Sequence, residues 1–260
     1  MLLISRPRFW LYTAGPYLVA TAFANPLYLT NPLFYLQFLL FLIPANFFIY
    51  GINDIFDTDT DTFNLKKRTK EVMGTNRNWI YIFSSFLLFI PYFFFLDNIG
   101  KLILGLFLLV SFAYSAPPFR FKKYPFIDAI SNVLYILPAL LAYWQHTQTL
   151  IPIHIFIAMW FWVIAMHMYS AVPDIVADTK AKLLTTPVLI GKTGALVLCG
   201  ALWLSATILT QFWIGLVYPI MIILSFKFPL TKLYWYFPYI NAAVGAVLFF
   251  SAIIPALIVL

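Results

Sequence analysis

The sequence predicts an all-α, polytopic membrane protein with nine transmembrane helices around a central cavity. Two observations indicate this fold class. First, 63% of the 260 residues are hydrophobic and only 10% are charged, which exceeds what a soluble core needs. Second, the basic residues gather in alternate connections between apolar segments, as membrane topology requires. We expect one membrane domain over residues 1–260, in contact with the lipid bilayer.

A helix needs about 20 residues to cross the hydrocarbon of a bilayer. The first span is expected to be a retained helix, because the start of the chain lacks a cleavable signal pattern. The second and sixth spans end at acidic clusters, and the eighth is the shortest. The expected spans are 9–24, 33–51, 78–96, 100–116, 126–144, 153–171, 194–211, 213–226 and 237–258.

The distribution of basic residues predicts the orientation of the chain. With nine spans, the N-terminus shares one face with the connections after the second, fourth, sixth and eighth helices. Only Lys101 falls on the opposite face. Because basic connections stay in the cytoplasm, we expect the N-terminus and the other connections of this face to be cytoplasmic. The remaining basic residues all lie there: Arg6, Arg8, Lys66, Lys67, Arg68, Lys70, Arg77, Arg120, Lys122, Lys123, Lys180, Lys182, Lys192, Lys227 and Lys232.

The net charge of +7 would suggest a nucleic-acid partner in a soluble protein. Here the basic residues lie in the connections of one face, so membrane topology accounts for the positive charge, and we expect no nucleic-acid partner. The single cysteine, Cys199, lies in an apolar segment and excludes an intramolecular disulfide.

Two acidic clusters lie at the expected cytoplasmic face, at the ends of the second and sixth spans. They hold six of the nine acidic residues. Carboxylates beside bilayer-length apolar segments are unfavourable and usually functional. The clusters read Asn53-Asp54-Ile-Phe-Asp57-Thr-Asp59-Thr-Asp61 and Asp174-Ile-Val-Ala-Asp178.

Helical spacing places the members of each cluster on shared faces. Asn53, Asp57 and Asp61 form one stripe, with Asp54 slightly to its side and Asp59 pointing away.

In the second cluster, Asp174 and Asp178 lie one turn apart on one face. Two such ends facing each other could offer carboxylates to one or two Mg²⁺ ions. Magnesium completes its coordination with water and phosphate oxygen, so the pattern favours a diphosphate-bearing substrate.

Structural alternatives exist for these clusters. The first could cap a helix and face water, and the second alone could be structural. The first also begins like a calcium-binding loop. However, Thr62 stands at the glycine position of that loop and Arg68 at its final glutamate position, so this alternative fails twice.

Phosphate also requires basic partners and hydrogen-bond donors. The segment Tyr114-Ser115-Ala-Pro-Pro-Phe-Arg120-Phe-Lys122 holds two candidates in a rigid context. The other candidates could serve topology alone, since lipid head groups attract basic residues. They are Lys66, Lys67, Arg68, Lys180 and Lys182.

Together these motifs resemble those of the UbiA superfamily of intramembrane prenyltransferases. The Asn53–Asp61 stretch is similar to its Asn-Asp-x-x-Asp-x-x-x-Asp signature, and Asp174 with Asp178 to its second Asp-x-x-x-Asp signature. The Tyr114–Lys122 segment is similar to the Tyr-Ser-x-Pro-Pro-x-Arg-x-Lys segment between them. The order, spacing and nine-helix layout agree, so the resemblance covers nearly the whole chain.

The resemblance implies that Mg²⁺ holds an allylic prenyl diphosphate between the two acidic motifs, and that an electron-rich, hydrophobic acceptor attacks the allylic carbon. The implied metal ligands are Asn53, Asp54, Asp57, Asp61, Asp174 and Asp178, of which the aspartates are catalytic. The implied diphosphate-binding residues are Asn53, Lys67, Arg68, Tyr114, Ser115, Arg120, Lys122 and Lys182. Aromatic residues that could line the chamber and stabilise a cation are Tyr50, Tyr114, Tyr135, Tyr143 and Tyr169.

Two sequence features bear on the acceptor. The opening Ile4–Pro16, the Ala171–Ile175 segment and Thr185-Thr186 resemble the lycopene elongase branch, which adds a five-carbon unit to a carotenoid end. An aromatic quinone precursor is the alternative acceptor. His167, seven residues before Asp174, could meet the acceptor or be a packed polar residue.

Two other classes were compared with these motifs. A CDP-alcohol phosphatidyltransferase also pairs aspartates around metal. Its first motif requires Asp-Gly followed by Ala-Arg, whereas here Asp57 is followed by Thr58 and no Ala-Arg appears. A cation-coupled transporter would place its carboxylates nearer the midplane, between inverted repeats. In this chain they are expected at one face, at the ends of helices of the same orientation.

Overall fold

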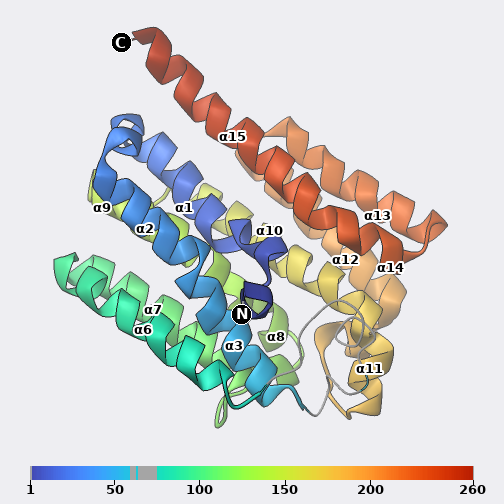
Figure 1. Ribbon diagram of the computed structural model, residues 1–260. Helices are drawn as coiled ribbons and strands as arrows, with labels where there is room; N and C mark the ends of the chain where they lie inside the picture. The colour runs from blue at the N-terminus through green and yellow to red at the C-terminus, as the bar shows by residue number, and fades with distance from the viewer. Residues whose placement is uncertain (1, 59–62, 64–74, 260) are drawn as a thin grey trace.

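The computed structural model describes residues 2–58, 63 and 75–259, and every regular element in this part of the chain is helical (Figure 1). The prediction of an all-α protein is therefore confirmed. The longer α-helices are α1 (Leu11–Ala24), α2 (Pro32–Leu42), α3 (Pro44–Phe56), α6 (Asn78–Phe95), α7 (Asn98–Ser115), α9 (Leu137–Thr147), α10 (Ile153–Ala171), α12 (Thr186–Thr210), α13 (Val217–Lys227) and α15 (Phe237–Val259). Short helices near the site are η1 (Leu2–Ser5), η2 (Pro7–Phe9), η4 (Phe121–Lys123), α8 (Ile127–Ile130), η5 (Ser131–Tyr135), η6 (Val172–Asp174), α11 (Ile175–Lys180) and η8 (Tyr234–Tyr236).

Each of the nine expected spans coincides with a helix or a bent helix pair in the described residues. By length and apolar composition, six helices there could cross a membrane. The count rises to seven if Ile127–Tyr135 and Leu137–Thr147, which meet at 40°, form one bent span. A multi-pass membrane protein is therefore supported, whereas the count of nine crossings stays a prediction.

The second expected span is broken between α2 and α3, where Pro44 has no N–H to donate. The side-chain amide of Asn46 compensates: its Nδ2 donates to the carbonyls of Phe41 (3.2 Å) and Leu42 (3.0 Å). Thr13 Oγ1 of α1 donates to the Phe41 carbonyl as well, at 2.6 Å. Neighbouring polar groups thus satisfy the carbonyls freed at the break between α2 and α3.

Helix packing is built largely from aromatic side chains. Trp203 of α12 is fully buried, and its ring centroid lies 5.1 Å from that of Tyr218 and 5.3 Å from that of Phe237. Tyr169 of α10 stacks on Phe237 at 4.8 Å, so α10, α12, α13 and α15 share one core. A second core joins α1, α2, α3, α6, α7 and α9.

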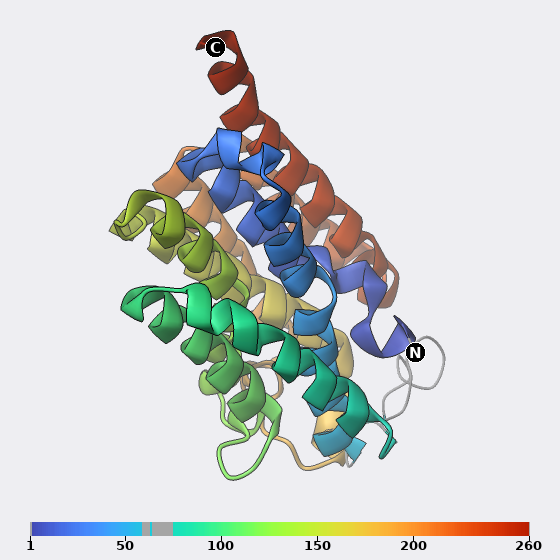
Figure 2. The same ribbon diagram turned by 60° about the vertical axis from the view of Figure 1, so that its left-hand side comes forward.

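The ends of the helices that carry the acidic motifs gather at one end of the bundle. Both views show the C-terminal end of α3 and the short helix α11 at this end, while the C-terminus of α15 projects at the opposite end (Figures 1 and 2). Segments about 120 residues apart in sequence are thereby brought to the same side of the molecule, in the arrangement that a shared site needs.

One close contact holds α3 against α6 just before the first acidic motif. A Cβ atom added at Gly51 would lie 2.8 Å from Ile82 Cγ1. We therefore expect Gly51→Ala to lower the free energy of unfolding by about 1–3 kcal/mol, because the helices must separate or Ile82 must leave its rotamer. The thermal midpoint in detergent measures this change.

Gly105 of α7 is the matched control, since an added Cβ there would meet nothing within 4 Å. Gly105→Ala should leave the midpoint unchanged or raise it slightly. Equal midpoints for the two variants would contradict a tight α3–α6 contact.

Candidate active site

The first acidic motif lies at the C-terminal end of α3, where a hydrogen-bond network orders its side chains. Asp54 and Asp57 are buried, with 1% and 6% of their surface exposed. Asn53 Nδ2 donates to Asp57 Oδ2 at 2.5 Å and to Ser115 Oγ at 3.1 Å. Ser115 is the last residue of α7, so this network ties the end of α3 to the end of α7.

Two cations balance the buried carboxylates of this motif. Arg6 Nη2 lies 2.7 Å from Asp54 Oδ1 and donates to Asn53 Oδ1 at 3.3 Å. Lys122 forms an ion pair with Asp57, and only 6% of its surface is exposed. Burying charge is tolerated when it is paired and hydrogen-bonded, as here. The structure thus pairs Lys122, which was predicted as a diphosphate ligand, with Asp57, and it adds Arg6 to the motif.

Arg6 was missed by sequence reasoning. It precedes the first expected span, and its two signals were its place on the basic face and in the Ile4–Pro16 segment, neither of which indicates a partner. Its backbone is left-handed at φ 49°, and Ser5 and Trp10 hold the surrounding turn through a hydrogen bond of 2.9 Å from Trp10 Nε1 to Ser5 Oγ. The guanidinium carbon also lies 4.6 Å from the centre of the Tyr50 ring.

The segment between the two motifs folds back over the end of α3. Arg120, with left-handed backbone at φ 43°, donates from Nη2 to the carbonyl of Phe56 at 2.8 Å. Carbonyls in the last turn of a helix lack partners within the helix, and a basic side chain satisfies them well. Arg120 therefore fixes the end of α3 that carries Asp57. Lys122, two residues further along the chain, pairs with the Asp57 carboxylate.

The second motif follows a break at the end of α10. Pro173 is the second residue of the 3-10 helix η6, which ends with Asp174, and Asp178 follows in α11. Thr185 Oγ1 donates to Asp178 Oδ2 at 3.3 Å. Lys182, the predicted phosphate ligand in this region, is exposed with φ 56°.

A buried carboxylate that sequence reasoning missed supports this region. Asp128 of α8 is fully buried, and it accepts a hydrogen bond of 2.8 Å from Thr186 N and a short one from Thr186 Oγ1. Phe126 N in turn donates to Thr186 Oγ1 at 2.6 Å. Thr185 and Thr186 thus connect Asp178 on one side to α8 on the other.

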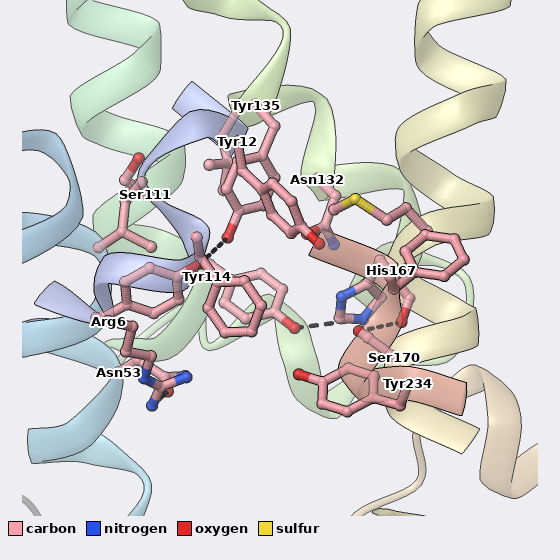
Figure 3. Close-up of a pocket in the computed structure, with 16 residues that line it drawn as sticks. Arg6, Tyr12, Asn53, Ser111, Tyr114, Asn132, Tyr135, His167, Ser170 and Tyr234 are labelled. Atoms are coloured by element: carbon pink, nitrogen blue, oxygen red, sulfur yellow. Dashed lines mark hydrogen bonds between the residues drawn. The ribbon is translucent and has the colours of Figure 1, made fainter. Parts of the chain in front are cut away.

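A cavity of about 160 Å³ lies among α1, α3, α7, α10 and η5, with the first motif at its edge (Figure 3). Arg6 and Asn53 line it on one side, and His167 and Ser170 of α10 line it on another. Its wall is rich in aromatic rings. The full lining is Arg6, Phe9, Tyr12, Ile49, Tyr50, Asn53, Ser111, Tyr114, Asn132, Leu134, Tyr135, Met166, His167, Ser170, Tyr234 and Phe237.

Tyr114 faces this cavity from the end of α7, beside Ser115. Its hydroxyl lies 3.4 Å from His167 Nε2. The end of α7 therefore contacts the first motif through Ser115 and faces α10 through Tyr114.

The predictions for the cavity wall hold for some tyrosines only. Tyr50, Tyr114 and Tyr135 line the cavity. Tyr169 does not, because it is fully buried in the aromatic core against Trp203 and Phe237. Tyr143 packs partly buried against the other core. The predicted site residues Asp61, Lys67 and Arg68 lie outside the described residues.

The donor set can be compared with the needs of a metal ion. Among the residues that the structure describes, no three His, Cys, Asp or Glu side chains are grouped to hold a metal. Within that part, the donors at the cavity edge are carboxylates and one amide oxygen, ordered by hydrogen bonds. These hard oxygen donors suit Mg²⁺, which takes few protein ligands and fills its other positions with water or phosphate.

Comparison with known proteins identifies the class to which this fold and site belong. Residues 11–256 match the UbiA prenyltransferase family, so the chain belongs to this family of integral, multi-pass membrane enzymes. It is an enzyme that transfers prenyl groups, and the predicted class is confirmed.

Two relatives in the family that share a name are similar to this chain over most of its length. The chain is 38% identical to the lycopene elongase/hydratase of Haloarcula japonica, over 95% of this chain and 88% of that protein. It is 35% identical to the protein of the same name from Corynebacterium glutamicum, over 80% and 75% of the two chains.

Solved structures share the fold. A UbiA homolog from Archaeoglobus fulgidus bound to GPP and Mg²⁺ has a TM-score of 0.70 and 23% identity, over 97% of this chain and 98% of that one. The apo structure of a UbiA homolog from Aeropyrum pernix K1 has a TM-score of 0.73 and 17% identity, over 97% and 99%.

The Asp128–Thr186 contact generates a prediction. Thr186→Val removes the hydroxyl donor and leaves a carboxylate oxygen of buried Asp128 without it, so we expect the free energy of unfolding to fall by about 1–3 kcal/mol. Because Thr185 contacts Asp178, the Mg²⁺ concentration for half-maximal activity should also rise. The thermal midpoint and a Mg²⁺ titration measure the two effects.

Thr210→Val is the control, since Thr210 Oγ1 donates to the Ala206 carbonyl within the same helix α12 and far from the site. It should leave the Mg²⁺ requirement unchanged. A Thr186→Val protein with the midpoint and Mg²⁺ requirement of the original would show that this contact does not position Asp178.

Proposed function

We propose that this prenyltransferase moves a five-carbon prenyl group from an allylic diphosphate to the end of a carotenoid, with Mg²⁺ as cofactor. One observation carries the proposal. The first acidic motif and its buried cationic partners lie at the edge of a tyrosine-rich cavity, and Ser170, four residues before the second motif, lines the opposite wall. Charge for a diphosphate and an aromatic-walled chamber for a prenyl group are thus adjacent.

The charged edge of the cavity is suited to the diphosphate. Arg6 and Lys122 supply positive charge there, and Asn53, Ser115 and Tyr114 supply hydrogen-bonding groups. Cations and donors at this place favour the leaving group most as the allylic C–O bond breaks and its negative charge grows. The proposed diphosphate ligands also include Lys67, Arg68, Arg120 and Lys182.

The proposed magnesium ligands are the oxygen donors of both motifs: Asn53, Asp54, Asp57, Asp61, Asp174 and Asp178. Bound Mg²⁺ would act there as a Lewis acid that neutralises the departing diphosphate. The structures of the Archaeoglobus fulgidus homologue, described as bound to GPP and Mg²⁺ and to DMAPP and Mg²⁺, support this pairing of metal and substrate.

The cavity wall is suited to the positive charge left on the prenyl group. Ring faces attract cations, by about 2 kcal/mol or more when the cation is desolvated. Tyr50 already has the guanidinium of Arg6 over its face at 4.6 Å, so this ring accepts positive charge at the cavity edge. Tyr12 and Tyr135 meet edge to face with their centroids 6.4 Å apart and continue the wall. Such a wall also excludes the water that would capture the cation.

The carotenoid acceptor is supported by the relatives. The proteins named lycopene elongase/hydratase are 35–38% identical over 80–96% of this chain. Their names describe two outcomes at a carotenoid end, elongation and addition of water. An aromatic quinone precursor is the second candidate acceptor, because other members of the UbiA superfamily prenylate such rings.

The acceptor and the metal are tested together by supplying purified protein with Mg²⁺, DMAPP and lycopene in lipid vesicles. We expect a carotenoid lengthened by five carbons, no product after chelation of the metal, and recovery when Mg²⁺ is restored. Asp57→Asn should lower the rate about 100-fold or more, since it removes a charged ligand of the Mg²⁺ that neutralises the departing diphosphate.

Asp97→Asn is the matched control. Asp97 caps α7 through Gly100 N at 2.7 Å and lies away from the acidic motifs, so its rate should match the original. Metal-dependent prenylation of an aromatic quinone precursor without any lengthened carotenoid would overturn the proposed acceptor in favour of the second candidate.

We also propose that the active-site end of the bundle, with the N-terminus, faces the cytoplasm. In a Cys199→Ala background, a cysteine at the exposed position Lys232 should react with an impermeant maleimide only in inside-out vesicles. A cysteine at exposed Thr149, on the opposite expected face, should react only in right-side-out vesicles. The same sidedness for both positions would contradict an odd number of crossings between them.

A further inference from the structure

Prenylation of an alkene creates a chemical demand that the diphosphate site does not meet. The C–O bond of the prenyl diphosphate breaks and its electron pair leaves with the diphosphate. The π electrons of the acceptor then form the new C–C bond, and a tertiary cation is left on the acceptor. An elongated alkene forms only when an adjacent C–H bond gives its electrons to a new C=C bond and its proton to a base.

Few groups in the cavity wall could take this proton. The charged group in the lining is Arg6, which is already a cation and pairs with Asp54. The remaining polar members, apart from one histidine, are hydroxyls and amides, which are weak bases. His167 is the lining residue whose neutral form is a good proton acceptor at ordinary pH.

The geometry places this imidazole where a base is needed. His167 lies in α10 and contacts the cavity opposite Arg6 and Asn53 (Figure 3). Its Nε2 atom is 3.4 Å from the Tyr114 hydroxyl, and the two rings meet edge to face with centroids 5.8 Å apart. Tyr114 precedes Ser115, which contacts the first motif through Asn53. The imidazole is therefore held next to the reaction chamber without belonging to the acidic motifs.

We propose that His167 is the catalytic base that takes the proton from the prenylated acceptor and so selects the alkene product over the hydrated one. The Tyr114 hydroxyl orients the ring and can accept a hydrogen bond from the imidazolium that forms. If the proton is not removed, water adds to the cation and then loses a proton, which gives an alcohol. This inference rests on the proposed carotenoid acceptor, because an aromatic acceptor would return no such choice of products.

The test compares products made by the purified full-length protein with Mg²⁺, DMAPP and lycopene. The lengthened alkene and its hydrated form differ by one water, so mass spectrometry gives their ratio. For His167→Gln, which keeps a polar side chain but not the base, we expect the alkene-to-alcohol ratio to fall at least about tenfold, within the usual effect of a general base.

An unchanged ratio, whether or not both products fall together, would overturn the proposal. It would mean that another group, such as the departing diphosphate, takes the proton. The matched control is His154→Gln, in the first turn of the same helix α10, where the side chain is exposed and outside the cavity lining. It should leave both the rate and the ratio unchanged.

A second variant separates loss of the base from loss of the fold. His167→Ala opens space in the cavity, and added imidazole should restore the alkene product in a concentration-dependent way. Absence of rescue in a variant that still unfolds at the original temperature would overturn the proposal. If the unaltered protein lengthens no carotenoid at all, the proposed function fails first, and that outcome is distinct from a product ratio that does not respond to His167.

Discussion

The arrangement of the site depends on the pairing of two buried carboxylates at the end of α3 with two cations from distant parts of the chain. Arg6 reaches Asp54 from before the first span, and Lys122 reaches Asp57 from the segment after α7. Removing one partner of a buried pair leaves an uncompensated charge and typically destabilises by about 3–5 kcal/mol. The N-terminal segment, α3 and the α7–α8 connection are therefore bound to one another by electrostatics at the place where the diphosphate is expected.

The end of α7 organises the rest of the site around that charge. Ser115 contacts the first motif and Tyr114 faces His167 of α10. Behind the second motif, Thr185 and Thr186 join Asp178 to the buried carboxylate of Asp128. Two helix ends from different halves of the chain are thus held on either side of one cavity, by Arg6 and Lys122 at the first motif and by Thr185 at the second.

Much of the fold and part of the site could be predicted because charge is rare in this chain. Carboxylates beside apolar segments stand out, and so do the alternating basic connections. Arg6 and Asp128 were missed because their partners lie 48 and 58 positions away, where no local pattern reports a contact. Tyr169 was assigned to the cavity wrongly because nearly every face of its helix is apolar, so spacing cannot separate the lipid, core and cavity sides. The broken second span was also beyond sequence patterning, since Asn46 and Thr13 act there through tertiary hydrogen bonds.

The position of Arg6 has a consequence for how this protein can vary. Its guanidinium reaches Asp54 only because the turn from Ser5 to Trp10 holds a fixed length of chain ahead of α1. Insertion or deletion of a single residue between Arg6 and Leu11 would withdraw the cation from the cavity, even with every motif intact. The length of the segment between Arg6 and Leu11 should therefore be as constrained as the identity of any aspartate. Homologous chains should keep this spacing while the residues between these two positions change.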